Sequence, residues 1–252
     1  MASFTNRTAL VTGGGSGLGA AISRALHAAG ANVILTGRRA EPLRTLATEL
    51  GSRATWATVD VADENSVVEL AEKLKDTEIS ILINNAGIGG PVAALTDISV
   101  QKWDEVFNIN VRGTFLMCKA FLPDMVSRGA GDVINLASVT GKRPLIRRTP
   151  YSASKMAVIG LTATLAFEVG PAGVNVNTLS PGPVDGPRMD RNFKLESART
   201  GISYEEAQDA FVSRAALGRM VTEEEVGTAV VAMLNMPGMC GADIDLSAGM
   251  IA

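Results

Sequence analysis

Three side chains in the middle of the chain have the types and spacing of an acid/base device. Tyr151 and Lys155 lie four residues apart, and Ser138 precedes the tyrosine by thirteen residues. On a helix, residues i and i+4 share a face, so the phenol and the ammonium would point the same way. A free tyrosine has a pKa near ~10. A cation about 4 Å away, at an effective dielectric of ~20, would stabilise its phenolate by about 4 kcal/mol. The pair predicts proton transfer near neutral pH, although an isolated Tyr-x-x-x-Lys is also common on ordinary helices.

A glycine-rich segment near the amino terminus has the composition of a phosphate-binding turn. It runs from Thr12 to Gly19, between a predicted strand and a predicted helix. Glycines let the backbone approach a pyrophosphate, and a helix start offers N–H groups and a positive dipole. A tight turn without a ligand is the alternative interpretation. The residues expected to contact a dinucleotide are Thr12, Gly13, Gly15, Ser16, Gly17, Leu18 and Gly19.

The end of the second predicted strand bears on the choice of cofactor. An acidic residue at this place would accept the ribose hydroxyls of NAD, but the segment reads Thr36-Gly37-Arg38-Arg39. An arginine here can pair with a 2′-phosphate. Arg38 therefore favours NADP(H), with NAD(H) as the alternative; the two arginines could also simply begin a solvated helix.

Short β-branched runs alternate with longer amphipathic stretches, which predicts an α/β fold with helices on both faces of a parallel sheet. Continuously apolar runs suit strands that are buried on both sides. Right-handed crossovers then give a doubly wound, seven-stranded sheet. The expected strands are residues 8–12, 32–36, 55–59, 79–84, 132–136, 174–179 and 243–246. The expected helices are residues 18–29, 41–50, 64–75, 100–107, 112–127, 152–168 and 223–234.

The whole chain, residues 1–252, reads as one domain with a single long insertion. Residues 183–218 follow Pro181-Gly182 as an irregular, polar and helix-prone region. A long insertion at the carboxyl end of a strand predicts a lid over the substrate site.

Composition narrows the classes of partner. A net charge of −3 gives no bias toward nucleic acid. No apolar run reaches ~18 residues, which predicts no membrane span, and the first residues lack the pattern of a signal peptide. Two cysteines are too few for a disulfide framework and indicate a cytoplasmic setting. His27 is the only histidine, which excludes Ser-His-Asp triads and histidine-based metal sites, so no metal is expected.

Taken in order, the motifs resemble those of the short-chain dehydrogenase/reductase family, and the resemblance covers essentially the whole chain. They are Thr12-Gly13-x-x-x-Gly17-x-Gly19, Asn84-Asn85-Ala86-Gly87, Asn110, Ser138, Tyr151-x-x-x-Lys155 and Pro181-Gly182. The resemblance implies a Rossmann-type fold that binds NAD(P), oxidation or reduction of an alcohol/carbonyl pair, and usually a homotetramer.

The resemblance also implies a role for each matching residue. Tyr151 would be the general acid/base, and Lys155 would lower the tyrosine pKa and bind the nicotinamide ribose. Ser138 would hold the substrate oxygen, and Asn110 would position a proton-relay water near the lysine. Cofactor contacts are further implied for Asp60, Val61, Asn85, Ala86, Gly87, Pro181, Gly182 and Val184.

Two positions depart from the family pattern. Gly186 stands where many relatives carry a threonine, so the nicotinamide carboxamide would lose one side-chain hydrogen bond. Asn175 stands where relatives often have arginine, which we interpret as structural variation.

The segment between Ser138 and Tyr151 is basic, with Lys142, Arg143, Arg147 and Arg148 close together. These cations could attract an anionic substrate or an acyl carrier protein, or they could form a solvated loop or a subunit contact. The candidate substrates are a 3-oxoacyl thioester, a sugar or polyol, or another secondary alcohol. A dinucleotide-binding regulator with little catalysis and a cofactor-dependent epimerase are the alternative functions.

Overall fold

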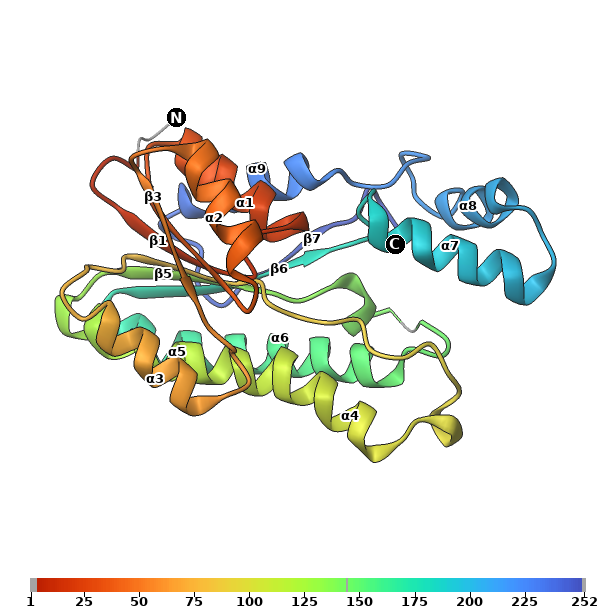
Figure 1. Ribbon diagram of the computed structural model, residues 1–252, viewed down its shortest axis with the longest axis horizontal. Coiled ribbons are helices and arrows are strands. Elements are labelled where there is room, and N and C mark those ends of the chain that lie inside the picture. The colour runs from red at the N-terminus through yellow and green to blue at the C-terminus, as the bar shows by residue number, and fades with distance from the viewer. Residues whose placement is uncertain (1–3, 144, 251–252) are drawn as a thin grey trace.

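A seven-stranded sheet forms the centre of the protein in the computed structural model, which describes residues 4–143 and 145–250 (Figure 1). All neighbouring strands are parallel, in the order β3-β2-β1-β4-β5-β6-β7. The predicted doubly wound, Rossmann-type α/β fold is therefore confirmed. The strands are β1 (Thr8–Thr12), β2 (Asn32–Gly37), β3 (Ala54–Thr58), β4 (Ile81–Asn84), β5 (Gly131–Leu136), β6 (Val174–Pro181) and β7 (Asp243–Leu246).

Helices cover both faces of this sheet, as Figure 1 shows. On one face lie α1 (Gly17–Ala28), α2 (Ala40–Leu50) and α9 (Glu223–Leu234). On the other lie α3 (Glu64–Lys73), α4 (Val100–Phe107), α5 (Gly113–Arg128) and α6 (Thr149–Val169). Short helical turns occur at η1 (Leu95–Asp97), η2 (Asn108–Arg112), η3 (Val139–Gly141) and η4 (Gly170–Ala172).

The two faces of the sheet bury separate apolar cores. Within β1, Val11 joins the core beneath α1 and α9, whereas its neighbour Leu10 joins the core beneath α3 and α5. This alternation follows from the two-residue period of a strand. Because both faces are covered, β1 and β4 read as continuous apolar runs, which is why they were predictable.

Helices α1 and α9 approach each other closely. A Cβ added at Gly227 of α9 would lie 2.9 Å from the Ala21 carbonyl oxygen of α1. The small residue lets the two backbones meet, and the amino-terminal end of α9 is thereby held close to that of α1.

The strand order of the sheet changes direction at β1. β1 pairs with β2 on one side and with β4 on the other. The loops that leave the carboxyl ends of β1 and β4 diverge to opposite faces, which is where open α/β sheets bind ligands.

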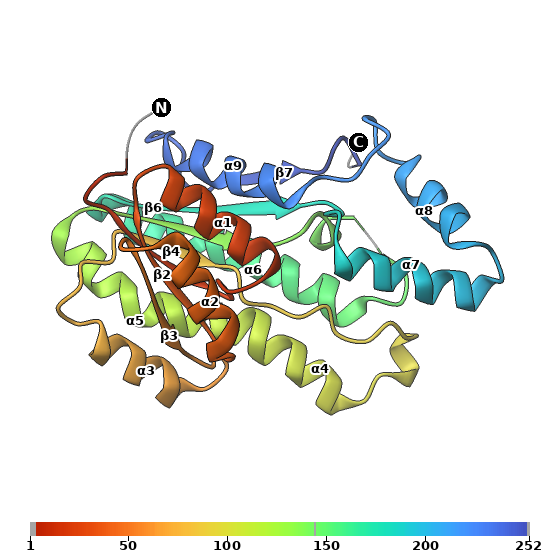
Figure 2. The same ribbon diagram turned by 45° about the horizontal axis from the view of Figure 1, so that its top comes forward.

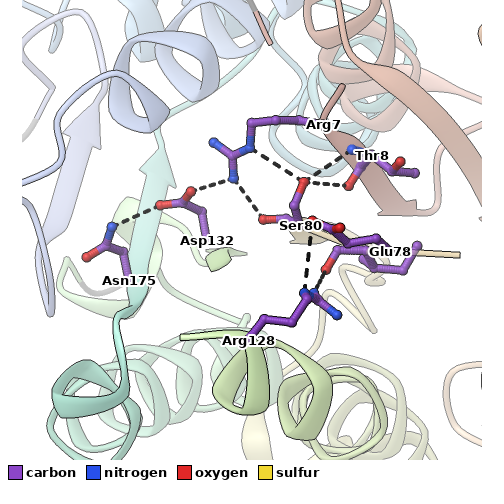
Figure 3. Close-up of polar contacts among 8 residues, drawn as sticks. Arg7, Thr8, Glu78, Ser80, Arg128, Asp132 and Asn175 are labelled. Atoms are coloured by element: carbon purple, nitrogen blue, oxygen red, sulfur yellow. Dashed lines mark hydrogen bonds and ion pairs between the residues drawn. The ribbon is translucent and has the colours of Figure 1, made fainter. Parts of the chain in front are cut away.

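The opposite, amino-terminal edge of the sheet is closed by a polar network, shown in Figure 3. Arg7 donates to the Ser80 carbonyl oxygen at 2.8 Å and to the Asp132 carboxylate at 2.6 Å. The Asn175 amide donates to the other carboxylate oxygen of Asp132 at 3.1 Å. Asn175 is thus a structural residue of this edge, where it helps to join β5 to β6.

The region after β6 differs from the sequence-based expectation. The region was expected to be irregular although helix-prone, and residues 183–218 in fact contain two regular helices, α7 (Pro187–Thr200) and α8 (Tyr204–Val212). Both views place these helices beyond the sheet, past the carboxyl end of β6 (Figures 1 and 2). The ring of Phe193 meets those of Tyr204 and Phe211 edge-on, at centroid distances of 5.9 and 5.6 Å. This small core of their own explains why a polar stretch folds into two helices.

Helix α6 starts earlier than predicted and carries much of the site. It begins at Thr149, with Pro150 in its first turn, where proline suits a helix start. Within the described residues, Thr149–Ala172 is long and apolar enough, by length and composition alone, to cross a bilayer. Because this segment carries buried Lys155 and packs against β6, we assign it to the helical layer of the fold.

Candidate active site

Tyr151 and Lys155 lie on one face of α6, as their spacing predicts. Both side chains are buried, with 8% and 6% of their surface exposed. The Lys155 ammonium nitrogen lies 5.8 Å from the centroid of the Tyr151 ring and donates to the Leu136 carbonyl oxygen at 2.7 Å. Since Leu136 ends β5, this bond fixes the ammonium at the carboxyl edge of the sheet.

Asn110 sits in η2, a π-helical turn between α4 and α5. Its side-chain oxygen accepts from the Ile88 N–H at 2.8 Å, and its amide nitrogen donates to the Ile88 carbonyl and to Ser154 Oγ, both at 3.0 Å. Ser154 in turn donates to the Tyr151 carbonyl oxygen at 2.8 Å. π-helical turns often occur at functional sites, and this one ties the loop after β4 to the start of α6.

Gly87 faces the space between two of these side chains. A Cβ added there would lie 3.1 Å from Asn110 Oδ1 and 3.5 Å from the Lys155 nitrogen. The structure therefore brings Gly87, Asn110 and Lys155 together at one point, although they come from three different segments.

Ser138 lies on the same edge, at the end of β5. Its hydroxyl is buried, accepts from the Thr140 N–H at 3.2 Å and donates to the Pro181 carbonyl oxygen at 3.4 Å. The turn that follows rests directly on α6, because a Cβ at Gly141 would lie 3.1 Å from the carbonyl carbon of Lys155. The hydroxyl is thus fixed between β5 and β6, and its turn is seated on the helix of the tyrosine and the lysine.

The glycine-rich loop joins β1 to α1 in a tight conformation. Gly13 and Gly17 have φ angles of 64° and 52°, which favour glycine. A Cβ at Gly19 would lie 2.0 Å from the Gly13 carbonyl oxygen, so only glycine fits there. Thr12 Oγ1 accepts from the N–H groups of Asn85 and Ala86, at 2.9 and 3.0 Å. Thr12 thus anchors the loop to the segment after β4.

The start of α1 is suited to an anion. Its N-cap residue, Ser16, makes no side-chain capping bond, and the first turn contains no acidic residue. The N–H groups of this turn therefore remain available, and the helix dipole favours negative charge. Beside the loop, Arg38 and Arg39 are exposed, and neither guanidinium group has an ion pair or hydrogen bond within residues 4–143 and 145–250. The glycine-rich loop and the start of α1 therefore form a site that fits the phosphates of a dinucleotide. Two guanidinium groups without partners among the described residues lie next to this site.

The remaining expected cofactor contacts lie at the carboxyl ends of other strands. Asp60 follows β3, and its carboxylate accepts from the Ala62 N–H at 3.0 Å in a local turn. Val61 is buried against Gly113, at the start of α5. After β6, the Gly182 N–H donates to Leu246, and Val184 forms a parallel bridge with Val221. These residues share the edge of the sheet that holds the glycine loop.

The four cations of the basic segment have different surroundings. Lys142 forms ion pairs with Asp243 and Asp245, and these pairs raise the pKa of Lys142 despite its partial burial. Arg143 donates to the Met250 carbonyl oxygen, and Arg147 is exposed. Only Arg148 reaches the site, buried with its guanidinium carbon 5.6 Å from the centroid of the Tyr151 ring.

Sequence reasoning missed a buried polar network behind the site. Asn84 donates to Asn135 at 2.8 Å, and Asn135 donates to Thr162 of α6 at 2.9 Å. Asn84 also donates to the Cys118 sulfur at 3.3 Å, while burial raises the pKa of that thiol to about 12. The network links β4 and β5 to the helix that carries Tyr151. The sign in the sequence is an asparagine within the last two residues of each of two apolar strands.

Comparisons with known proteins identify the family of the chain. Residues 7–197 match the family model of the short chain dehydrogenases, and the chain belongs to that family. A Streptomyces coelicolor protein named as a candidate ketoacyl reductase is 36% identical over 247 residues, which cover 94% of this chain and 93% of that protein. The resemblance inferred from the motifs is therefore confirmed.

Two solved structures are similar over nearly the whole chain. A variant of actinorhodin polyketide ketoreductase with NADPH is 32% identical, with a TM-score of 0.92 and 99% of both chains covered. An NAD+-bound xylitol dehydrogenase is 27% identical, with a TM-score of 0.92, covering 98% of this chain and 99% of that one. These neighbours bind nicotinamide dinucleotides, and the family places this chain among the oxidoreductases.

Proposed function

We propose that this protein is an NAD(P)-dependent oxidoreductase that interconverts a secondary alcohol and a carbonyl. The observation that carries the proposal is the pairing of Tyr151 and Lys155 on one face of α6, at the sheet edge that also holds the glycine loop. A structural role alone would not need a phenol and an ammonium buried together beside a phosphate cradle.

When bound, the nicotinamide would supply or accept the hydride. The residues of the chain transfer the proton. In reduction, the Tyr151 phenol donates a proton to the substrate oxygen; in oxidation, the phenolate removes it. Lys155 stabilises the phenolate by its charge. The Ser138 hydroxyl hydrogen-bonds the same oxygen and stabilises negative charge that develops on it. Asn110 holds the loop after β4 beside the lysine and positions a water for proton exchange.

NADP(H) is the cofactor that we favour. Arg38 and Arg39 follow β2, and a Cβ at Gly37 would lie 3.8 Å from Gly13 Cα, so both arginines begin next to the glycine loop. Their exposed guanidinium groups suit a 2′-phosphate. A Michaelis constant clearly lower for NAD(H) would reverse this choice.

The substrate is a small molecule, and helices α7 and α8 form the outer wall of its pocket. A 3-oxoacyl thioester and a polyol are both consistent with the relatives, named as ketoacyl reductase and xylitol dehydrogenase. Arg148, beside the Tyr151 ring, favours a substrate that carries negative charge.

We propose a cytoplasmic homotetramer. Several apolar side chains on α5 and α6 are exposed in the single chain, among them Phe115 at 48%, Met156 at 46% and Phe167 at 85%. Exposed apolar patches of this kind mark interaction surfaces. Light scattering of the purified protein measures the assembly directly, and a monomer would contradict it.

A substrate panel assayed with both NADP(H) and NAD(H), followed by the absorbance of the reduced nicotinamide, tests the proposal. We expect steady oxidation or reduction of at least one secondary alcohol or carbonyl, faster with NADP(H). Dinucleotide binding without turnover across the panel would favour a regulatory protein. Conversion of substrate with no net change in nicotinamide would favour an epimerase.

A further inference from the structure

Glu223, the first residue of α9, faces the glycine-rich loop. Its Oε1 atom lies 3.6 Å from where a Cβ on Gly17 would stand and 3.5 Å from where a Cβ on Gly186 would stand. The two glycines come from the start of α1 and from the segment after β6. The carboxylate therefore occupies the space between the phosphate cradle and the loop that leads into α7.

The neighbouring acidic residues of α9 have different surroundings. Glu225 accepts from the Thr222 N–H and pairs with Arg219, which lowers the pKa of Glu225 to about 2. Glu224 is exposed. Glu223 is half-buried, and its carboxylate makes no hydrogen bond or ion pair with any residue that the structure describes. Burial raises the pKa of this carboxyl group. The helix dipole favours an acidic residue in the first turn of α9, but a carboxylate that loses water without gaining a hydrogen-bond partner is unfavourable.

The carboxylate lies next to a helix start that is suited to bind an anion. The first turn of α1 offers uncapped N–H groups and a positive dipole end, and it carries no acidic residue of its own. A dinucleotide places its pyrophosphate at this kind of helix start. The Glu223 carboxylate lies beside this turn, because its Oε1 atom is 3.6 Å from the position of a Cβ on Gly17.

We propose that Glu223 competes with the cofactor pyrophosphate for the anion seat at the start of α1. The inference rests on the proposed function, because it requires a dinucleotide to bind there. Two like charges repel strongly at this range, so the carboxylate must swing out when the cofactor enters. Glu223 thereby weakens cofactor affinity and favours release of the cofactor after turnover.

Titration calorimetry on the purified protein tests this competition. We compare the wild type with Glu223→Gln, and use Glu224→Gln as the matched control, since it removes one exposed charge from the same helical turn. The probes are NADPH, 2′-phospho-ADP-ribose (which has the pyrophosphate but lacks nicotinamide) and adenosine 2′-monophosphate (which lacks the pyrophosphate). We expect Glu223→Gln to bind the first two roughly 5- to 20-fold more tightly, with no change for the third. Glu224→Gln should bind all three as the wild type does.

Specific outcomes would overturn the inference. Affinities of Glu223→Gln equal to those of Glu224→Gln would show that the carboxylate does not compete. Weaker NADPH binding with unchanged 2′-phospho-ADP-ribose binding would make Glu223 a ligand of the nicotinamide instead. If the wild type bound neither NADP(H) nor NAD(H), the proposed function itself would be contradicted. If the wild type bound the cofactor well and Glu223→Gln bound it no more tightly, only the competition by Glu223 would be contradicted. Thermal unfolding of both variants checks that each is folded.

Discussion

The two edges of the central sheet use polar side chains in opposite ways. At the amino edge, Arg7 and Asp132 bond to each other and to their neighbours, so donors and acceptors are matched within the protein (Figure 3). At the carboxyl edge, Arg38, Arg39 and Glu223 lack such partners among the described residues. The amino edge joins strands together, whereas the carboxyl edge keeps charge available for a ligand. Substitutions at the two edges should therefore separate stability from activity.

The largest expected effect is at the carboxyl edge. Replacing Lys155 with methionine removes the charge that stabilises the Tyr151 phenolate but keeps most of the side-chain volume. We expect kcat to fall by about 10³-fold. Circular dichroism should show a folded protein with a melting temperature close to that of the wild type. A kcat within tenfold of the wild-type value would mean that this edge does not depend on the ammonium.

The next effect concerns the cofactor. The double substitution Arg38→Ala/Arg39→Ala removes both guanidinium groups beside the glycine loop. Since a hydrogen-bonded charge contributes about 1.5–3 kcal/mol, NADP(H) affinity should fall about 10- to 100-fold. NAD(H) affinity, measured by the same fluorescence titration, should change little. An equal loss for both cofactors would contradict the assignment of these arginines to a 2′-phosphate.

At the amino edge the expected effect is on stability. Asp132→Asn removes the charge that pairs with Arg7, both partners being less than a third exposed. We expect a loss of about 1–2 kcal/mol in the free energy of unfolding by urea, with kcat per folded molecule unchanged. Glu72→Gln, which breaks an exposed pair with Lys75, is the control and should cost less than about 0.5 kcal/mol. If Asp132→Asn lowered kcat without loss of stability, the amino edge would serve activity as the carboxyl edge does, and the two edges would not differ in role.

The smallest effect tests the charge on the substrate. Arg148→Gln removes the cation that lies against the Tyr151 ring, whereas Arg147→Gln removes its exposed neighbour. For an anionic substrate, we expect the first change to lower kcat/KM by about 3- to 10-fold and to reduce its salt dependence. The second should leave both nearly unchanged. If catalytic efficiency proves insensitive to salt and to both substitutions, the substrate is not recognised by its charge.

Much of the fold was predictable because it depends on local periodicity. The buried strands are short apolar runs, and most of the helices between them are amphipathic. The segment of α7 and α8 was recognised only as helix-prone, without helix bounds, because α7 is polar overall. Its Phe193 finds apolar partners only when Tyr204 and Phe211 of α8 fold back onto it. The contact that stabilises these helices is tertiary, and spacing within either segment does not reveal it.

The same distinction holds for the site. Tyr151 and Lys155 could be placed together because one helical turn relates them. The basic segment could not be interpreted in this way, since Lys142 pairs with Asp243 and Asp245, about a hundred positions away. A role for Glu223 was not predictable from the sequence, because a glutamate in the first turn of a helix is common. Its significance depends on the close packing of α9 against α1.

Turnover by Tyr151→Phe at saturating cofactor tests the central claim most directly. The variant lacks only the phenolic oxygen, so cofactor affinity, measured separately by titration, should stay near the wild-type value. With a substrate found by the panel, we predict a loss of kcat by several orders of magnitude. Near-normal turnover by a folded, cofactor-bound Tyr151→Phe protein would show that the phenol does not transfer the proton, and would contradict the account.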